Sequence, residues 1–177
     1  MLETATPAAR SYNQHSGVLT IDIRVIAVGK IKENFYRQAL QHYARRLKPY
    51  ARLEIVELAE GKEEGRGDFA LTTLLKEEGD KIVRQLRQDA HCIVLTPEGR
   101  KMKTEELAAY LKNLQHSSPR IDLVIGGAAG LAGEIKLKSD LCLSLSDLTF
   151  PHRLARVILL EQLYRCFKII RGEPYHK

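Results

Sequence analysis

The residues best suited to chemistry lie at the end of the chain, in Tyr175-His176-Lys177. An imidazole has a pKa near neutral pH, so His176 is a candidate general base. Tyr175 beside it could stack on a nucleobase. A histidine this close to a terminus is more often a solvated surface group, so both interpretations stay open.

A basic segment leads into these residues. Between Pro151 and Lys177 there are six Lys or Arg residues and two acidic ones, which accounts for +4 of the net charge of +6. Such a segment favours a nucleic-acid partner, although a solvated helix face is the alternative. Arginine can neutralise charge on a substrate carbonyl or bind phosphates. The candidate RNA-binding residues are Arg156, Arg165, Lys168, Arg171 and Lys177.

These basic residues share a predicted helix with a broad apolar face. Aliphatic and aromatic residues recur at spacings of three and four from Leu154 to Ile170, and the arginines are expected on the other side. Pro151 suits the first helical turn because its φ is fixed and it has no N–H. His152 is expected to cap or pack at the helix start, and Gly172 to follow its last turn.

The elements before this helix alternate between strand and helix. Short apolar runs predict strands, and apolar residues at helical spacing predict helices. This alternation predicts an α/β fold, with a mostly parallel sheet and helices on both faces. The expected strands are 21–28, 53–58, 91–95, 121–125 and 141–145, and the expected helices are 34–47, 69–88, one capped by Thr104, and 134–138.

Three loops that follow strands could bind a ligand, because ligands of parallel sheets collect at the carboxyl ends of the strands. Leu95-Thr-Pro-Glu-Gly99 surrounds a proline, and Gly126 to Gly130 is rich in glycine, which lets backbone approach a ligand closely. Leu145 to Phe150 offers hydroxyl and backbone groups. Each loop alone could equally be a simple tight turn.

Composition narrows the class of protein. A chain of 177 residues with 44% hydrophobic residues can form one globular domain, expected over 21–177, and no apolar run is long enough to span a membrane. Residues 1–20 are polar and lack the apolar centre of a secretory signal, so we expect a disordered N-terminal extension. The three cysteines lie in apolar segments without metal-ligand spacing, which predicts reduced thiols in a cytoplasmic protein and no metal.

Several segments together resemble the RlmH family of SPOUT-class methyltransferases. They are Thr149-Phe-Pro-His152, Arg156 to Arg165 and Arg171-Gly-Glu-Pro-Tyr-His-Lys177, with Val28-Gly-Lys30, Leu95 to Gly99 and Val124 to Leu131 upstream. The resemblance implies a C-terminal trefoil knot, S-adenosylmethionine as methyl donor with S-adenosylhomocysteine as product, and a homodimer. It also implies the substrate, N3 of a pseudouridine in helix 69 of 23S rRNA, on the assembled 70S ribosome.

The resemblance further implies roles for individual residues. Catalysis is assigned to His176, Tyr175 and Arg165, with the target site shared between two protomers. Cofactor binding is assigned to Leu95, Gly126, Leu145, Ser146, Asp147, Leu148, Thr149 and Phe150.

Two other functions remain open. A non-catalytic module that binds the ribosome or RNA could use the same basic surface. A nucleotide-binding α/β enzyme could use Gly126, Gly127 and Gly130, but their spacing is not Gly-x-Gly-x-x-Gly and the Lys and Ser/Thr of a P-loop are missing.

Overall fold

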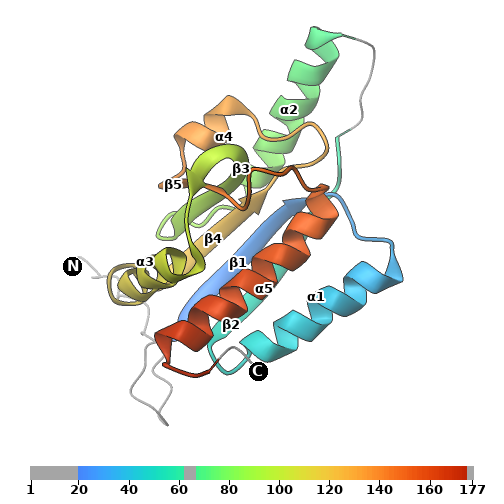
Figure 1. The fold of residues 1–177 in the computed structure, drawn as a ribbon. Coiled ribbons are helices and arrows are strands. Elements are labelled where there is room, and N and C mark those ends of the chain that lie inside the picture. Colours follow the sequence, from blue (N-terminus) through green and yellow to red (C-terminus); the bar gives the residue numbers. More distant parts are fainter. Residues whose placement is uncertain (1–19, 62–66, 175–177) are drawn as a thin grey trace, which may run out of the picture.

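The computed structural model describes residues 20–61 and 67–174. Its centre is a sheet of five parallel strands in the order β2-β1-β4-β3-β5 (Figure 1). The strands are β1 (Ile21–Val28), β2 (Ala51–Leu58), β3 (His91–Lys101), β4 (Arg120–Ile125) and β5 (Leu141–Ser144).

Helices cover both faces of this sheet, as the sequence predicts (Figure 1). On one face, α5 lies between α1 and α3, and apolar side chains of all three pack in the larger core cluster. On the other face, α2 and α4 contribute Ile82 and Ile135 to a smaller cluster. The helices are α1 (Asn34–Leu47), α2 (Asp68–Val83), α3 (Thr104–Ser117), α4 (Gly133–Leu137) and α5 (His152–Ile170).

The central strand β1 shows why the sequence adopts this architecture. Val25 faces the larger cluster and Ile26 the smaller one, because successive side chains of a strand point to opposite faces. Val25 is 1% exposed and Ile26 is fully buried, so β1 is covered on both sides. A strand that is apolar on both faces is typical of parallel sheets. The predicted α/β fold is therefore confirmed, whereas the trefoil knot stays a prediction.

Strand β3 differs from its prediction. The sequence indicates that it ends at Leu95, but it continues to Lys101. Leu95 and Arg100 both pair with Leu143 of β5, so residues 96–99 bulge out of the strand between them. Gly99 permits this path, because a Cβ there would lie 2.6 Å from the backbone carbon of Leu143. The expected exit loop is therefore a bulge within a strand, and it is fixed on both sides.

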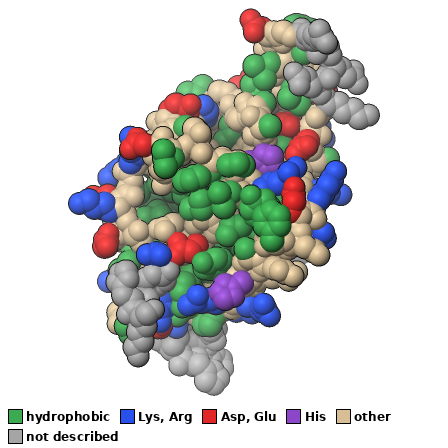
Figure 2. All heavy atoms as spheres, turned by 45° about the vertical axis from the view of Figure 1, so that its right-hand side comes forward, with side chains coloured by type: hydrophobic (Ala, Val, Ile, Leu, Met, Phe, Trp, Pro, Cys, Tyr) green, Lys and Arg blue, Asp and Glu red, His purple; other side chains and the backbone are tan. Residues whose placement is uncertain are grey.

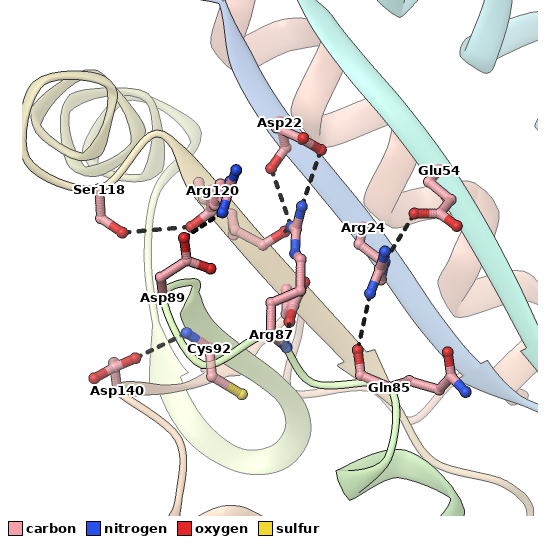
Figure 3. Close-up of polar contacts among 12 residues, drawn as sticks. Asp22, Arg24, Glu54, Gln85, Arg87, Asp89, Cys92, Ser118, Arg120 and Asp140 are labelled. Carbon is pink, nitrogen blue, oxygen red and sulfur yellow. Dashed lines mark hydrogen bonds and ion pairs between the residues drawn. The ribbon is translucent and has the colours of Figure 1, made fainter. Parts of the chain in front are cut away.

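The chain after α2 also departs from the prediction, because the helix ends at Val83 and not at Gln88. Arg87 is held outside the helix by the fully buried Asp122 of β4, and its guanidinium also faces Asp22 of β1 (Figure 3). The backbone N–H of Arg87 donates to Asp122 Oδ2 at 2.8 Å, and its Nε donates to Oδ1 at 2.9 Å. Asp22 pairs with the same guanidinium at 3.1 Å. This group of ionic contacts ends the helix and joins it to the sheet.

Helix α5 ends at Ile170, and Gly172 follows its last turn, as the sequence predicts. The N–H of Gly172 donates to the carbonyl of Ile169 at 3.0 Å, and the N–H of Glu173 donates to that of Lys168 at 2.9 Å. This pair of bonds is the Schellman arrangement. At the other end, Pro151 is the N-cap residue and the helix begins at His152, so Pro151 lies just before the first turn in which the sequence predicts it. Similarly, Thr104 is the first residue of α3 and not its cap.

The remaining predictions concern the cysteines, membrane-spanning segments and the N-terminal extension. Cys92 and Cys166 are buried free thiols, and Cys142 is a half-buried one. None of the helices in the described ranges could cross a membrane. The predicted N-terminal extension lies outside the described residues except for Thr20.

Candidate functional site

A cavity of about 700 Å³ opens at the carboxyl end of the sheet. This volume is within the range of roughly 300–1,000 Å³ that small-molecule sites occupy. Its walls come from the β3 bulge, from residues 126–131 after β4, from residues 143–150 in and after β5, and from the first turn of α5. The bulge of β3, the loop after β4, Lys136 of α4 and the segment that leads from β5 into α5 therefore form one site.

The loop after β5 is shaped by its own serine residues. Ser144 Oγ donates to the carbonyl of Ser146 at 3.0 Å, and Ser146 Oγ accepts from the N–H of Leu148 at 3.0 Å. The Ser146 hydroxyl oxygen therefore folds the loop in addition to lining the cavity. Leu148 and Phe150 line the same cavity, and the Leu148 side chain stays 73% exposed. The loop thus offers apolar side chains and backbone groups together.

The loop after β4 turns tightly from Gly126 to Gly130. The N–H of Gly130 donates to the carbonyl of Gly127 at 3.1 Å. A Cβ on Gly126 would lie 2.6 Å from the carbonyl carbon of Gly130 and 2.9 Å from Leu131 Cγ. The glycine is therefore needed for the loop to fold against itself, and not only for a ligand to approach.

A buried carboxylate supports this glycine loop from the side of α2. Glu78 is 4% exposed, and its Oε1 accepts from the N–H of Gly61 at 3.0 Å. A Cβ on Gly127 would lie 3.1 Å from Glu78 Oε2. Glu78 thus connects the segment after β2 with the back of the glycine loop.

The β3 bulge adds a charged group to the cavity. Thr96 Oγ1 donates to Glu98 Oε2, and Lys136 Nζ of α4 donates to the same oxygen at 3.3 Å. The bond from Thr96, more than the charge of Lys136, holds the pKa of the Glu98 carboxyl below its usual value. Glu98 and Lys136 both line the cavity.

His152 forms part of the wall where α5 begins. Its side chain is 15% exposed, and Nε2 lies 3.8 Å from Glu60 Oε1. Burial lowers the pKa of this imidazole, and the charges of Arg156 and Arg153 lower it further. His152 therefore packs at the start of the helix, as expected. It also lines the cavity.

The predicted cofactor-binding residues meet at this cavity, with one exception. Leu95, Gly126, Leu145, Ser146, Leu148, Thr149 and Phe150 all line it. Asp147 lies in the same loop but points away and pairs with Lys101, with 78% of its side chain exposed. Lys136 is not among the site residues predicted from the sequence, and Glu98 is predicted only as a member of its loop. A lysine in a short polar helix carries no sequence signal that would assign it to a site.

Arg156 does not lie on the exposed face of α5, where the sequence predicts it. Its side chain is 1% exposed, pairs with Glu57 at 3.0 Å and donates to the carbonyl of Val28. It therefore ties the start of α5 to the ends of β1 and β2. A guanidinium buried in this way cannot contact a phosphate, so its placement on the exposed face of the helix is wrong.

Arg165 and Lys168 lie further along α5, and Arg171 is its C-cap residue. Arg165 Nε donates to Glu161 at 2.5 Å, one helical turn earlier. Lys168 pairs with Glu173 at 2.6 Å. Arg171 donates to the carbonyl of Pro49 at 2.8 Å and lies over the ring of Tyr50. Tyr175, His176 and Lys177 lie outside the described residues.

The chemistry of the cavity favours an organic ligand with an apolar ring system. Leu95, Ile125, Leu143 and Leu145 supply apolar surface, while the loops supply backbone donors and acceptors. Among the residues that the structure describes, no group of His, Cys, Asp or Glu side chains could hold a metal ion.

Comparison with known proteins identifies a related family. A family model described as a predicted SPOUT methyltransferase matches residues 21–176. Curated relatives carry the name ribosomal RNA large subunit methyltransferase H. The relative from Bifidobacterium adolescentis is 45% identical over 157 residues, which cover 88% of this chain and 99% of the relative. The relative from Acetivibrio thermocellus is 43% identical with the same coverage, and that from Bacillus pumilus is 40% identical over 89% of this chain and all of the relative.

Proposed function

Because the chain belongs to the SPOUT methyltransferase family, we propose that it transfers a methyl group from S-adenosylmethionine to ribosomal RNA of the large subunit. The proposed acceptor is N3 of a pseudouridine in helix 69 of 23S rRNA, methylated on the assembled 70S ribosome. The observation that carries this proposal is the cavity at the strand ends, where the residues assigned to the cofactor meet.

The cavity fits the methyl donor in both size and chemistry. Apolar side chains such as Leu95, Leu145 and Phe150 are suited to the faces of an adenine ring. Backbone groups of Gly126 and of residues 145–150 would bind its polar edge and the ribose. When bound, the sulfonium supplies an electrophilic methyl group. The protein's part is to hold that group in line with the acceptor nitrogen and away from water.

Gly126→Val tests the assignment of the glycine loop. We expect the variant to lose measurable binding of S-adenosylmethionine in calorimetry, because the new side chain would displace the loop from Gly130 and Leu131. The misfit should also lower the free energy of unfolding by about 1–3 kcal/mol, as overpacking does. Gly133→Ala is the matched control, since a Cβ there meets no atom within 4 Å. Wild-type cofactor affinity in a folded Gly126→Val variant would contradict the assignment.

The acceptor requires two further groups. N3 of a pseudouridine carries a proton between two carbonyls, so a base must remove it and a donor or cation must stabilise the charge on the carbonyl oxygens. We assign the base to His176, stacking of the nucleobase to Tyr175, and charge stabilisation to Arg165. Arg165, Lys168, Arg171 and Lys177 are also the proposed contacts to RNA phosphates, and Arg156 is no longer among them.

We infer from the covalent reach of the chain that His176 and its neighbours act in the cavity of a partner protomer. Lys168 follows His152 by sixteen helical residues, which is about 24 Å at 1.5 Å per residue. The N–H of Glu173 is bonded to the carbonyl of Lys168, and the backbone from Glu173 to His176 spans at most about 11 Å. Because about 11 Å of backbone is much shorter than a helix of about 24 Å, we expect His176 to act outside the cavity of its own chain.

We propose a homodimer in which the end of one chain completes the cavity of the other. The outer side of α5 keeps Leu154, Val157 and Ile158 only half-buried. Figure 2 shows apolar side chains gathered at the centre of one face, with charged side chains around them. An apolar area with a charged rim is typical of a protein–protein interface.

Methyl transfer to ribosomes tests the proposed function. The protein is incubated with labelled S-adenosylmethionine and either 70S ribosomes or free 23S rRNA, and the modified nucleoside is identified by mass spectrometry. We expect incorporation at one pseudouridine of helix 69, and only with ribosomes. Ribosome binding without cofactor binding or methyl transfer would instead support the non-catalytic RNA-binding module.

A further inference from the structure

One ion pair in the cavity has no role in the function proposed so far. Lys136 Nζ lies 3.3 Å from Glu98 Oε2, and both residues line the cavity. They come from different elements, Lys136 from α4 and Glu98 from the bulge in β3. The pair therefore joins two walls of the site.

The backbone segments that carry Glu98 and Lys136 are fixed more firmly than those of a typical ion pair on a protein surface. Glu98 lies in a bulge that is held by β5 pairing on both sides, and the Thr96 hydroxyl orients its carboxylate. Lys136 belongs to a short helix anchored by Ile135, which is 1% exposed. The Ser139 hydroxyl also donates to the carbonyl of Lys136 at 2.7 Å. The charged ends nevertheless stay accessible, with 72% of the Glu98 side chain and 36% of the Lys136 side chain exposed.

The side chains of this pair differ in charge from the other described residues that line the cavity. Among the residues that the structure describes along the cavity, Glu98 has the only carboxylate and Lys136 the only ammonium group. Both hydrogen bonds to Glu98 are accepted by Oε2, so Oε1 can accept from a ligand. Lys136 uses one of its three N–H groups on Glu98, so it can donate to a second carboxylate.

We propose that Glu98 and Lys136 bind the amino-acid end of S-adenosylmethionine. The Glu98 carboxylate accepts hydrogen bonds from the α-ammonium group, and the Lys136 ammonium donates to the α-carboxylate. A zwitterion matches an existing ion pair, because each charge of the ligand meets an opposite charge without leaving another unpaired. This assignment rests on the proposed function and adds the residues that distinguish the donor from a simpler adenosine derivative.

Calorimetry with two ligands tests the assignment. S-adenosylmethionine carries the amino acid, whereas 5′-methylthioadenosine keeps the adenine, ribose and thioether but lacks it. We expect Glu98→Gln and Lys136→Met each to weaken S-adenosylmethionine binding by about tenfold, the lower end for a hydrogen bond to a charged group, because solvent screens the pair. Neither substitution should change the affinity for 5′-methylthioadenosine.

Two variants on the same helix control for the change in net charge. Glu134→Gln and Lys138→Met each alter an exposed residue of α4 or its end that does not line the cavity. Both should bind the two ligands as the wild type does. Melting temperatures of all four variants should remain close to that of the wild type, since none of the residues is buried.

The outcomes separate this inference from the proposed function. Wild-type protein that binds neither ligand would overturn the proposed function itself. If the wild type binds both ligands and the Glu98 and Lys136 variants keep full affinity for S-adenosylmethionine, the amino-acid assignment is wrong and the function stands. Equal loss of both ligands would show that the pair maintains the cavity's shape, which would also overturn the assignment.

Discussion

Deletion of Tyr175–Lys177 is expected to abolish methyl transfer to ribosomes while S-adenosylmethionine still binds. The cavity proposed for the cofactor is lined by residues between Leu95 and Ala155, whereas the proposed base and stacking group are His176 and Tyr175. Loss of a general base costs typically 10²–10⁴-fold in rate. Loss of the stacking group should lower the rate further. Turnover on 70S ribosomes and calorimetry with the cofactor measure the two effects separately.

Single substitutions separate the contributions of His176 and Arg165. His176→Ala should lower kcat more than it raises the KM for ribosomes, because a base acts only in the transition state. Arg165→Ala should lose rate as well, although part of its loss would come from the broken pair with Glu161. A tail-deleted protein that methylates at the wild-type rate would show that the base lies elsewhere. Loss of cofactor binding would instead place the tail in the donor site.

A mixed dimer tests whether the site is shared. A dimer of one tail-deleted chain and one Gly126→Val chain contains a single complete site, formed by the cavity of the first chain and the tail of the second. We expect this dimer to recover about half of the wild-type activity, since one of two symmetric sites is intact. Absence of recovery, with the dimer intact, would mean that each chain uses its own tail.

The order and type of the elements could be predicted from the sequence because their signals are local. Val25 and Ile26 belong to an apolar run that only a doubly covered strand accommodates. Gly172 follows a helix whose last turn needs that residue's N–H. The loops at the cavity were found for the same reason, since each follows an apolar run directly.

Features that depend on distant partners could not be predicted. The bulge after Leu95 exists because Leu143 of β5 pairs on both sides of it, and β5 lies more than forty residues away in the sequence. The ion pair of Glu98 and Lys136 depends on the same bulge. Helix α2 ends early because Asp122 of a later strand binds Arg87.

The burial of Arg156 could have been predicted from its spacing to apolar residues, but its charge suggested an exposed position. Arg156 precedes Leu159, Leu160 and Leu163 by three, four and seven residues, and all of these leucines are buried. That spacing places Arg156 on the buried side of α5. An arginine is seldom fully buried unless it is paired, so its charge suggested the exposed side instead.

Arg156→Ala is therefore expected to destabilise the fold and not merely to weaken ribosome binding. The substitution removes the ionic partner of Glu57 and the side-chain donor to the carbonyl of Val28. Breaking a buried ion pair costs about 3–5 kcal/mol, and we expect about 3 kcal/mol because the Glu57 side chain keeps 32% exposure to water. Urea denaturation of the purified variant measures the change.

Arg153→Ala is the matched control for this experiment. Arg153 lies one turn earlier on the same helix and pairs with Glu33 at 2.8 Å, but its side chain is 33% exposed. Loss of such a pair should cost at most about 1 kcal/mol. Arg156→Lys should fall between the two, because lysine keeps the charge but cannot reach Glu57 and Val28 with two separate nitrogens. If Arg156→Ala were as stable as the wild type and lost only ribosome affinity, the guanidinium would have to leave its buried position to bind RNA, and the structural role assigned to it would be wrong.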